Sequence, residues 1–297
     1  MPSLKHLTLI TAFLTLASIS LYAKPLDIIV SIVPQKAFVE AVGGNKVSVS
    51  VLLPPGASPH SFEMTPLQMK TLAQSKLYIR IGHIAFEQAN LDRIRSLNPS
   101  LVIVDSSKGI RIRQGDNLDC VPGFPVQDSH DHDHGYEKGD PHTWMSPLLA
   151  IHHVRNTTAA LIKADPANRT FYEKNSRSFI TRLKETDGQI HRQLTAYKGK
   201  TFLIFHPALG YFADAYGVNE ISVEIDGKNP TSKQLTYLVS FARKRHIKAI
   251  LVPRQTGALM ARSVADSIGG KVIDVDPMAA DYIENLKVIS SILAKTL

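Results

Sequence analysis

The chain has 297 residues, of which 44% are hydrophobic and 20% charged, with 34 Lys and Arg against 26 Asp and Glu. This composition excludes a disordered chain and a polytopic membrane protein, and the length predicts about two domains. The net charge of +8 is spread along the chain without a base-reading motif, so no nucleic-acid partner is expected. The single cysteine, Cys120, excludes an internal disulfide and a thiolate-rich metal site.

The first 23 residues have the pattern of a secretory signal peptide. Lys5 precedes an apolar run over residues 7–17, and small residues then lead to Ala23, near which we expect cleavage. Ser and Thr interrupt the run, which is too short to span a bilayer comfortably. Because no cysteine follows it, no stable lipid anchor is expected. The sequence therefore predicts export to a periplasm-like space.

After this segment, short apolar runs alternate with helical patterns in two sets. In the first set, the predicted strands are 28–33, 47–53, 77–81 and 101–104, and the helices are 35–42, 66–75 and 86–97. In the second set, the strands are 202–205, 221–223, 249–252 and 271–275, with helices near 211 and at 232–246, 257–268 and 282–295. Such alternation predicts parallel sheets covered by helices.

One long helical pattern separates the two sets. Asp165 is the expected N-cap, Pro166 suits the first turn, and the pattern ends near Tyr197. The predicted fold class is therefore α/β with two lobes, each a mainly parallel sheet flanked by helices. The expected divisions are a signal peptide at 1–23, a first lobe at 24–165, a connecting helix at 166–198 and a second lobe at 199–297.

Four residues form a candidate metal site. His60 closes a proline-rich loop after the second predicted strand, and His142 lies in a loop flanked by prolines. His206 and Asp276 directly follow predicted strands, where ligands gather in α/β folds. Three imidazoles and one carboxylate suit tetrahedral Zn²⁺, whereas Mn²⁺ prefers more oxygen ligands. Taken alone, this pattern leaves a metal site and a metal-free cleft equally open.

The remaining histidines of the twelve divide into three groups. His130, His132 and His134 alternate with aspartates and indicate a secondary, weaker metal-binding loop or a solvated polar loop. His83 follows a predicted strand and is a candidate for the border of the site. The other histidines in helical patterns are expected on the surface: His152, His153, His191 and His246.

Five segments carry a resemblance to a known family. They are PPGASPHSFEMTP around His60, DPHTWMSP around His142, FHPALGYFADAYG around His206, EIDGKNPTSKQL at 224–235, and DVDPMAADYIENL around Asp276. In this order and spacing the chain resembles the periplasmic zinc-binding components of ABC uptake systems, the TroA-like (ZnuA-type) solute-binding proteins. The departures are Val252-Pro253-Arg254-Gln255, where relatives have an acidic-proline-glutamine pattern, and the absence of the paired second-lobe cysteines of some members.

The resemblance implies two lobes joined by one rigid helix, with the metal held in the cleft between them. It assigns His60 and His142 as ligands from the first lobe, and His206 and Asp276 as ligands from the second. Histidine at the third position, His206, implies Zn²⁺ rather than Mn²⁺. The tract at 130–134 falls where zinc-type members carry an acidic histidine loop.

The function implied by the resemblance is capture of Zn²⁺ and its delivery to an ABC permease in the inner membrane. We expect a monomer without enzymatic activity. The first alternative is a zinc hydrolase, but the sequence lacks HExxH and Asp276 is expected to fill the fourth metal position. The second is a surface adhesin on the same scaffold, against which the missing lipid anchor argues.

Overall fold

The computed structural model describes residues 24–58, 62–113, 139–225, 228–256 and 258–297. The expected signal segment 1–23, His60, and the tract with His130, His132 and His134 lie outside the described residues. For these the sequence-based predictions stay predictions.

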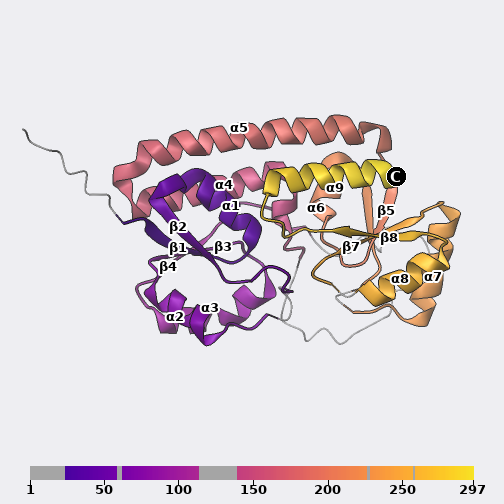
Figure 1. The fold of residues 1–297 in the computed structure, drawn as a ribbon, viewed down its shortest axis with the longest axis horizontal. Helices are drawn as coiled ribbons and strands as arrows, with labels where there is room; N and C mark the ends of the chain where they lie inside the picture. The colour runs from indigo at the N-terminus through magenta and orange to yellow at the C-terminus, as the bar shows by residue number, and fades with distance from the viewer. Residues whose placement is uncertain (1–23, 59–61, 114–138, 226–227, 257) are drawn as a thin grey trace, which may run out of the picture.

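Two four-stranded parallel sheets lie side by side within the described residues (Figure 1). The first has the order β2-β1-β3-β4, with β1 Leu26–Val30, β2 Val47–Val51, β3 Leu77–Arg80 and β4 Val102–Asp105. The second has the order β6-β5-β7-β8, with β5 Thr201–Ile204, β6 Asn219–Ser222, β7 Ala249–Pro253 and β8 Lys271–Val275. Both sheets use the same topology, so each has a point where the strand order reverses, between its first and third strands. Such points are where α/β sheets bind ligands.

Helices cover both faces of each sheet. Figure 1 places α2 and α3 on one side of the first sheet and α1 and α4 on the other. The helices are α1 Val33–Gly43, α2 Pro66–Gln74, α3 Ala85–Leu97, α4 Pro147–Ala164, α5 Arg169–Leu194, α6 Gly210–Tyr216, α7 Ser232–Lys244, α8 Ala258–Ser267 and α9 Tyr282–Thr296. We call the first sheet with α1 to α4 the first lobe, and the second sheet with α6 to α9 the second lobe. This arrangement confirms the predicted α/β class.

Local sequence signals explain where several helices begin. The side chains of Thr65 and Gln68 form a capping box at α2, and Thr231 and Gln234 form another at α7. Each box satisfies backbone N–H groups that a helix N-terminus leaves without partners. Of the helices in the described ranges, none combines the length and the apolar character that crossing a bilayer requires.

The long helix α5 runs along both lobes (Figure 1). It packs against α1 and α4 of the first lobe and against α6 and α9 of the second. Its buried face carries Tyr172, Phe179, Leu183, Ile190 and Leu194. The predicted connecting helix is thus present.

The helical segment starts at Pro166 with Asp165 at the N-cap position, as the sequence predicts, but its first turn is not α-helical. Residues Pro166–Asn168 form a separate 3₁₀ turn, and α5 begins at Arg169. Asp165 makes no side-chain cap; its Oδ2 accepts hydrogen bonds from the Tyr172 hydroxyl at 2.6 Å and from Asn168 Nδ2 at 2.7 Å. The carboxylate therefore braces the turn between α4 and α5.

A continuous apolar core joins the two lobes. The ring of Phe38 on α1 meets that of Tyr282 on α9 edge-on, with centroids 4.8 Å apart. Trp144 Nε1 donates to the carbonyl of Pro277 at 2.9 Å, and the Tyr282 hydroxyl donates to the carbonyl of Trp144 at 2.5 Å. These contacts hold the segment that follows β8 against the loop that follows His142.

Candidate metal site

His142 lies in the first lobe, directly before the 3₁₀ turn Thr143–Met145 that leads into α4. Its ring is buried, and its Nδ1 lies 2.8 Å from Asp140 Oδ1. The same carboxylate oxygen accepts the backbone N–H of His142 at 2.9 Å. Burial alone would raise the pKa of Asp140, but the hydrogen bonds from His142 and the charge of Arg113 bring that pKa below its usual value. Asp140 is therefore an ionised carboxylate that holds the His142 imidazole through its Nδ1.

His206 is the matching residue in the second lobe. It follows β5, the strand at which the order of the second sheet reverses. Its ring is buried, and its Nδ1 lies 2.7 Å from Glu224 Oε2. When the proton is on Nδ1 of either histidine, the lone pair is on Nε2. Carboxylates that bind one nitrogen in this way orient the ring for a metal at the other.

The two rings meet across the junction of the lobes. Their centroids are 5.6 Å apart and their planes are inclined by 74°. They border a cavity of about 20 Å³, which is room for one water-sized particle. The described residues that line it are Ser58, His142, His206, Ala208, Pro253, Gln255, Thr256, Pro277 and Met278.

Asp276 lies beside this cavity at the end of β8. Its Oδ1 accepts hydrogen bonds from Gln255 Nε2 at 2.7 Å and from the backbone N–H of Met278 at 3.0 Å, and both donors belong to residues of the cavity lining. The carbonyl of Asp276 accepts Asn285 Nδ2 at 2.7 Å. These bonds fix the carboxylate and its backbone at the rim of the site.

The described residues alone do not make a complete metal site. Within them, no group of three or more His, Cys, Asp or Glu side chains is arranged to hold a metal ion. The structure brings His142 and His206 together and places Asp276 near them, whereas His60 lies outside its range. His83 adopts a left-handed backbone conformation, with φ of 63°, and is not among the lining residues described.

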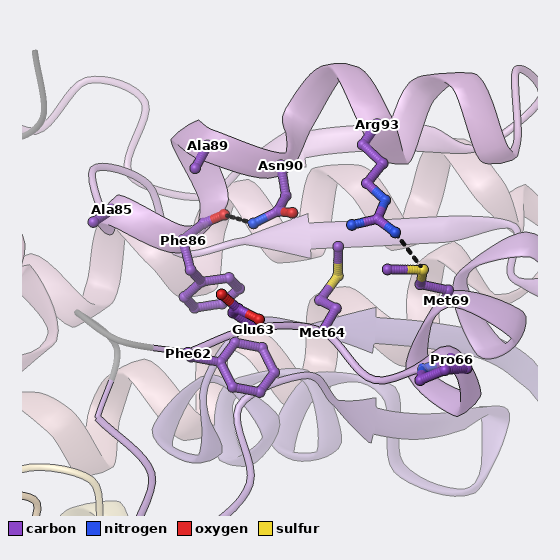
Figure 2. Close-up of a pocket in the computed structure, with 10 residues that line it drawn as sticks. All are labelled: Phe62, Glu63, Met64, Pro66, Met69, Ala85, Phe86, Ala89, Asn90 and Arg93. Atoms are coloured by element: carbon purple, nitrogen blue, oxygen red, sulfur yellow. Dashed lines mark hydrogen bonds between the residues drawn. The ribbon is translucent and has the colours of Figure 1, made fainter.

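A larger cavity, of about 780 Å³, opens between α2 and α3 of the first lobe (Figure 2). Its described lining is largely apolar, with the rings of Phe62 and Phe86 stacked edge-on at 5.1 Å. Glu63 and Arg93 are the charged side chains of that lining. A single carboxylate and a guanidinium do not make a metal site, and the described lining of this cavity includes none of the predicted ligands.

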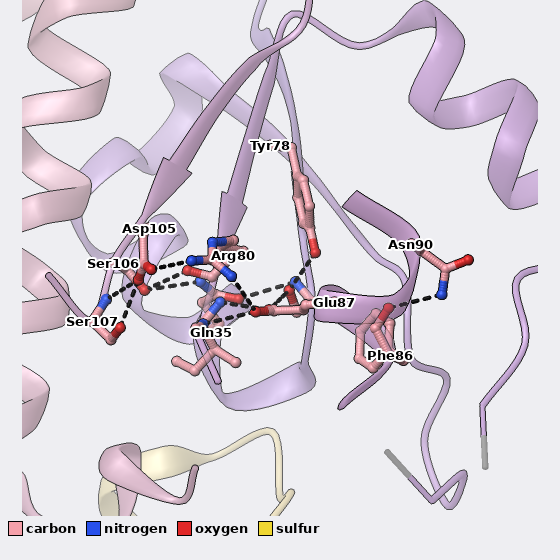
Figure 3. Close-up of polar contacts among 12 residues, drawn as sticks. Gln35, Tyr78, Arg80, Phe86, Glu87, Asn90, Asp105, Ser106 and Ser107 are labelled. Carbon is pink, nitrogen blue, oxygen red and sulfur yellow. Dashed lines mark hydrogen bonds and ion pairs between the residues drawn. The ribbon is translucent and has the colours of Figure 1, made fainter. Parts of the chain in front are cut away.

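A buried polar network fills the switch point of the first sheet (Figure 3). Glu87 of α3 accepts the backbone N–H groups of Ile81 and Gly82 at 2.8 and 2.9 Å, as well as the Ser31 hydroxyl. Arg80 Nη1 lies 3.7 Å from Glu87 Oε2. Burial raises the pKa of Glu87 to about 7, against the opposing effect of these partners.

His153 extends the network towards the His142 loop. Its prediction as a surface residue is wrong, because it is fully buried on α4. Its Nδ1 lies 2.9 Å from the Ser106 hydroxyl, and its Nε2 lies 2.9 Å from the hydroxyl of Thr143, the residue after His142. Burial lowers the pKa of His153 to about 3, so the ring is neutral. The neutral His153 ring thus supports the loop that carries His142, through its contact with Thr143.

Sequence reasoning missed the two carboxylates behind the histidines. Asp140 and Glu224 both lie in segments that carry the family resemblance, but neither was given a role. The general rule that a ligating histidine binds a carboxylate through its second nitrogen could have pointed to them. Which acid does so depends on the fold.

The fold and the cavity together define a class: a two-lobed α/β protein with a long joining helix and a small histidine-lined cavity where the lobes meet. The chain belongs to the family described as ZnuA, zinc-uptake complex component A, periplasmic, whose model matches residues 28–296. This confirms the resemblance found in the sequence.

Individual relatives agree with this assignment. The chain is 27% identical over 257 residues to a protein of Bacillus subtilis named high-affinity zinc uptake system protein ZnuA, covering 83% of this chain and 76% of that protein. It is also 27% identical over 267 residues to the zinc-binding protein AdcA of Streptococcus pyogenes serotype M3, covering 84% of this chain but only 50% of AdcA.

Solved structures show the same architecture. A crystal structure of ZnuA has 30% sequence identity and a TM-score of 0.83, covering 92% of this chain and 99% of that one. A ZnuA deletion mutant described as zinc-bound has 31% identity and a TM-score of 0.81, covering 92% and 98%.

Proposed function

We propose that this protein captures Zn²⁺ in the periplasm and delivers it to an ABC permease for import. Membership of the zinc-uptake family supports this function, as do relatives named for zinc uptake and a similar structure described as zinc-bound. Export by a signal peptide cleaved near Ala23 and a monomeric state are parts of the same proposal. Binding and release need no bond chemistry, so we propose no enzymatic activity.

The two facing imidazoles carry the proposal. Around a tetrahedral zinc with Zn–N distances of about 2.0–2.1 Å, two imidazole centroids lie about 5.2 Å apart. The rings of His142 and His206 have centroids 5.6 Å apart. The separation of the two rings is therefore close to that of two imidazoles bound to one zinc ion. Asp140 and Glu224 would accept the Nδ1 protons and increase the basicity of the ligands.

We propose His60 and Asp276 as the remaining ligands. Ser58, two residues before His60, lines the cavity, and Asp276 is held by Gln255 of the same lining. A set of three nitrogens and one carboxylate oxygen favours Zn²⁺ over Mn²⁺. The tract with His130, His132 and His134 would bind a second zinc more weakly.

The first test is a zinc titration of the double variant His142→Ala, His206→Ala. The wild-type protein should hold one zinc tightly, measured against a competing chelator and by elemental analysis, and the double variant should lose it while remaining folded. His191→Ala is the matched control, because His191 is exposed on α5. Equal zinc binding by the double variant and the wild type would refute the site.

The second test concerns the histidine tract. Deletion of residues 128–135 should remove a second, weaker zinc and leave the tight one in place. Two unchanged binding steps after the deletion would refute the role of the tract.

A further inference from the structure

Arg113 lies between the two lobes, close to the proposed zinc site but outside its ligand set. Its Nε donates to Asp214 Oδ2 at 2.9 Å, on α6 of the second lobe, and its Nη1 lies 3.7 Å from Asp140 Oδ2 in the first. The side chains of Arg113 and Asp140 are 11% and 9% exposed, whereas that of Asp214 is 58% exposed. The guanidinium is thus held by a buried acid on one side and an exposed acid on the other.

Backbone hydrogen bonds of Arg113 and Asp140 also connect the two lobes. The N–H of Asp140 donates to the carbonyl of Arg113 at 2.8 Å, so the two residues are also joined through their main chains. The N–H of Arg113 donates to the hydroxyl of Tyr211 at 2.8 Å, and that hydroxyl donates to the carbonyl of Asp140 at 2.9 Å. Tyr211 belongs to α6, so its hydroxyl ties the backbones of both Arg113 and Asp140 to the second lobe.

Helix α6 packs directly against this ion pair at Gly210. A Cβ atom on Gly210, the first residue of α6, would lie 2.6 Å from Arg113 Nη1 and 2.7 Å from Asp140 Oδ2. Both distances are shorter than real Cβ contacts, so glycine allows α6 to approach the ion pair directly. The position of Asp140 therefore depends on how closely α6 of the second lobe packs against the first lobe.

Asp140 transmits that dependence to the site, because its other oxygen binds Nδ1 and the backbone N–H of His142. We propose that Arg113 is a positioning residue that couples the orientation of His142 to the contact between the lobes. The inference rests on the proposed function, since it takes His142 to be a zinc ligand. When the lobes separate, Arg113 would lose Asp214 and Tyr211, Asp140 would relax, and the His142 ring would leave its binding orientation.

Electrostatics alone predicts the opposite effect of removing Arg113. A guanidinium near the site repels Zn²⁺, so its loss would strengthen zinc binding if charge were its main effect. A positioning role predicts weaker binding, by the 10- to 100-fold typical when a partner that orients a metal ligand is removed. The direction of the change in zinc affinity therefore separates the two roles.

The experiment compares Arg113→Met and Gly210→Ala with Arg111→Met, using the full mature chain. Arg111→Met removes the same charge from an exposed residue two positions away and should leave the affinity within about twofold. Arg113→Met should weaken zinc binding about 10- to 100-fold, still with one tight site. Gly210→Ala keeps every charge but displaces the Arg113–Asp140 ion pair, so it should also weaken zinc binding. This variant provides the test if Arg113→Met does not fold.

A second measurement uses Co²⁺ as a spectroscopic probe in place of zinc. Arg113→Met and Gly210→Ala should change the visible d–d absorption of bound Co²⁺, because the His142 ring is reoriented, whereas Arg111→Met should not. Unchanged or tighter zinc binding with an unchanged Co²⁺ spectrum in both variants would overturn the positioning role. If the wild-type protein bound no zinc, or bound it without His142 and His206, the proposed function itself would fail.

Discussion

Replacing the buried His153 with glutamine should change the way in which the stability of the protein responds to acid. The ring is fully buried between the hydroxyl groups of Ser106 and Thr143, and glutamine can keep one of these two hydrogen bonds. At pH 7 the variant should lose about 1 kcal/mol of unfolding free energy for the other bond. The informative quantity is the change, between pH 7 and pH 5, in the difference in unfolding free energy between the variant and the wild type.

The sign of the His153 contribution follows from its lowered pKa. Burial lowers this pKa from 6.5 to about 3, so between these values the unfolded chain takes up a proton that the folded protein does not. The stabilisation is therefore complete above pH 6.5 and decreases as the pH falls towards 3. At about 1.4 kcal/mol per pH unit, the wild-type protein should lose about 2 kcal/mol through His153 between pH 7 and pH 5.

Glu87 contributes with the opposite sign. Burial raises its pKa from 4.5 to about 7, so the folded protein keeps this proton over a range in which the unfolded chain loses it. Stability from this group is complete below pH 4.5 and decreases as the pH rises towards 7. Acidification from pH 7 to pH 5 should therefore restore about 2 kcal/mol, which nearly cancels the loss from His153.

The assay is urea unfolding of the metal-free wild type and His153→Gln at pH 7 and pH 5, with a chelator present. The unfolding free energy of the variant, relative to that of the wild type, should rise by about 2 kcal/mol on acidification. Groups that titrate in both proteins cancel in this comparison. Equal changes in the two proteins would show that His153 does not resist protonation, and would refute the argument from burial.

Three further substitutions test other contacts. Glu224→Gln keeps an acceptor for His206 Nδ1 but removes the charge, so the zinc dissociation constant should rise about tenfold in a chelator competition; an unchanged constant would contradict the role of Glu224. Trp144→Phe removes the hydrogen bond to the Pro277 carbonyl and should lower the unfolding free energy by about 1–2 kcal/mol, whereas no loss in urea unfolding would count against this bond. Phe38→Ala should cost about 3–5 kcal/mol, because the ring is fully buried against α5 and α9; a cost below 1 kcal/mol would show that the core closes around the gap.

Much of the fold could be predicted because parallel strands and amphipathic helices have distinct apolar periods. The run Lys271–Val275 was predicted with its observed bounds, and the other strands within a few residues. The helical segment starts at Pro166 as predicted, but the sequence did not reveal that its first turn is a 3₁₀ turn or that Asp165 makes no capping hydrogen bond. In the structure its carboxylate instead binds the hydroxyl of Tyr172, and the sequence does not show which way the side chain turns.

The site could be predicted in its ligand types but not in its supporting contacts. His206 and Asp276 were recognisable because they follow strands, whereas Arg113 reaches Asp214 across about a hundred residues of sequence. His153 is different, because the sequence did contain a signal. It lies at helical spacing with the buried residues Ala150, Val154 and Thr157, so the apolar period placed it on the inner face of α4.

The position of α9 has a consequence for the way in which the chain is made. Tyr282 closes the core beside Phe38, so the first lobe lacks part of its interior until α9 has been synthesised. The first lobe of an emerging chain therefore stays incompletely folded until α9 is available to pack against it. A premature stop before residue 282 would destabilise the amino-terminal half, although that half would contain every residue of its own sheet.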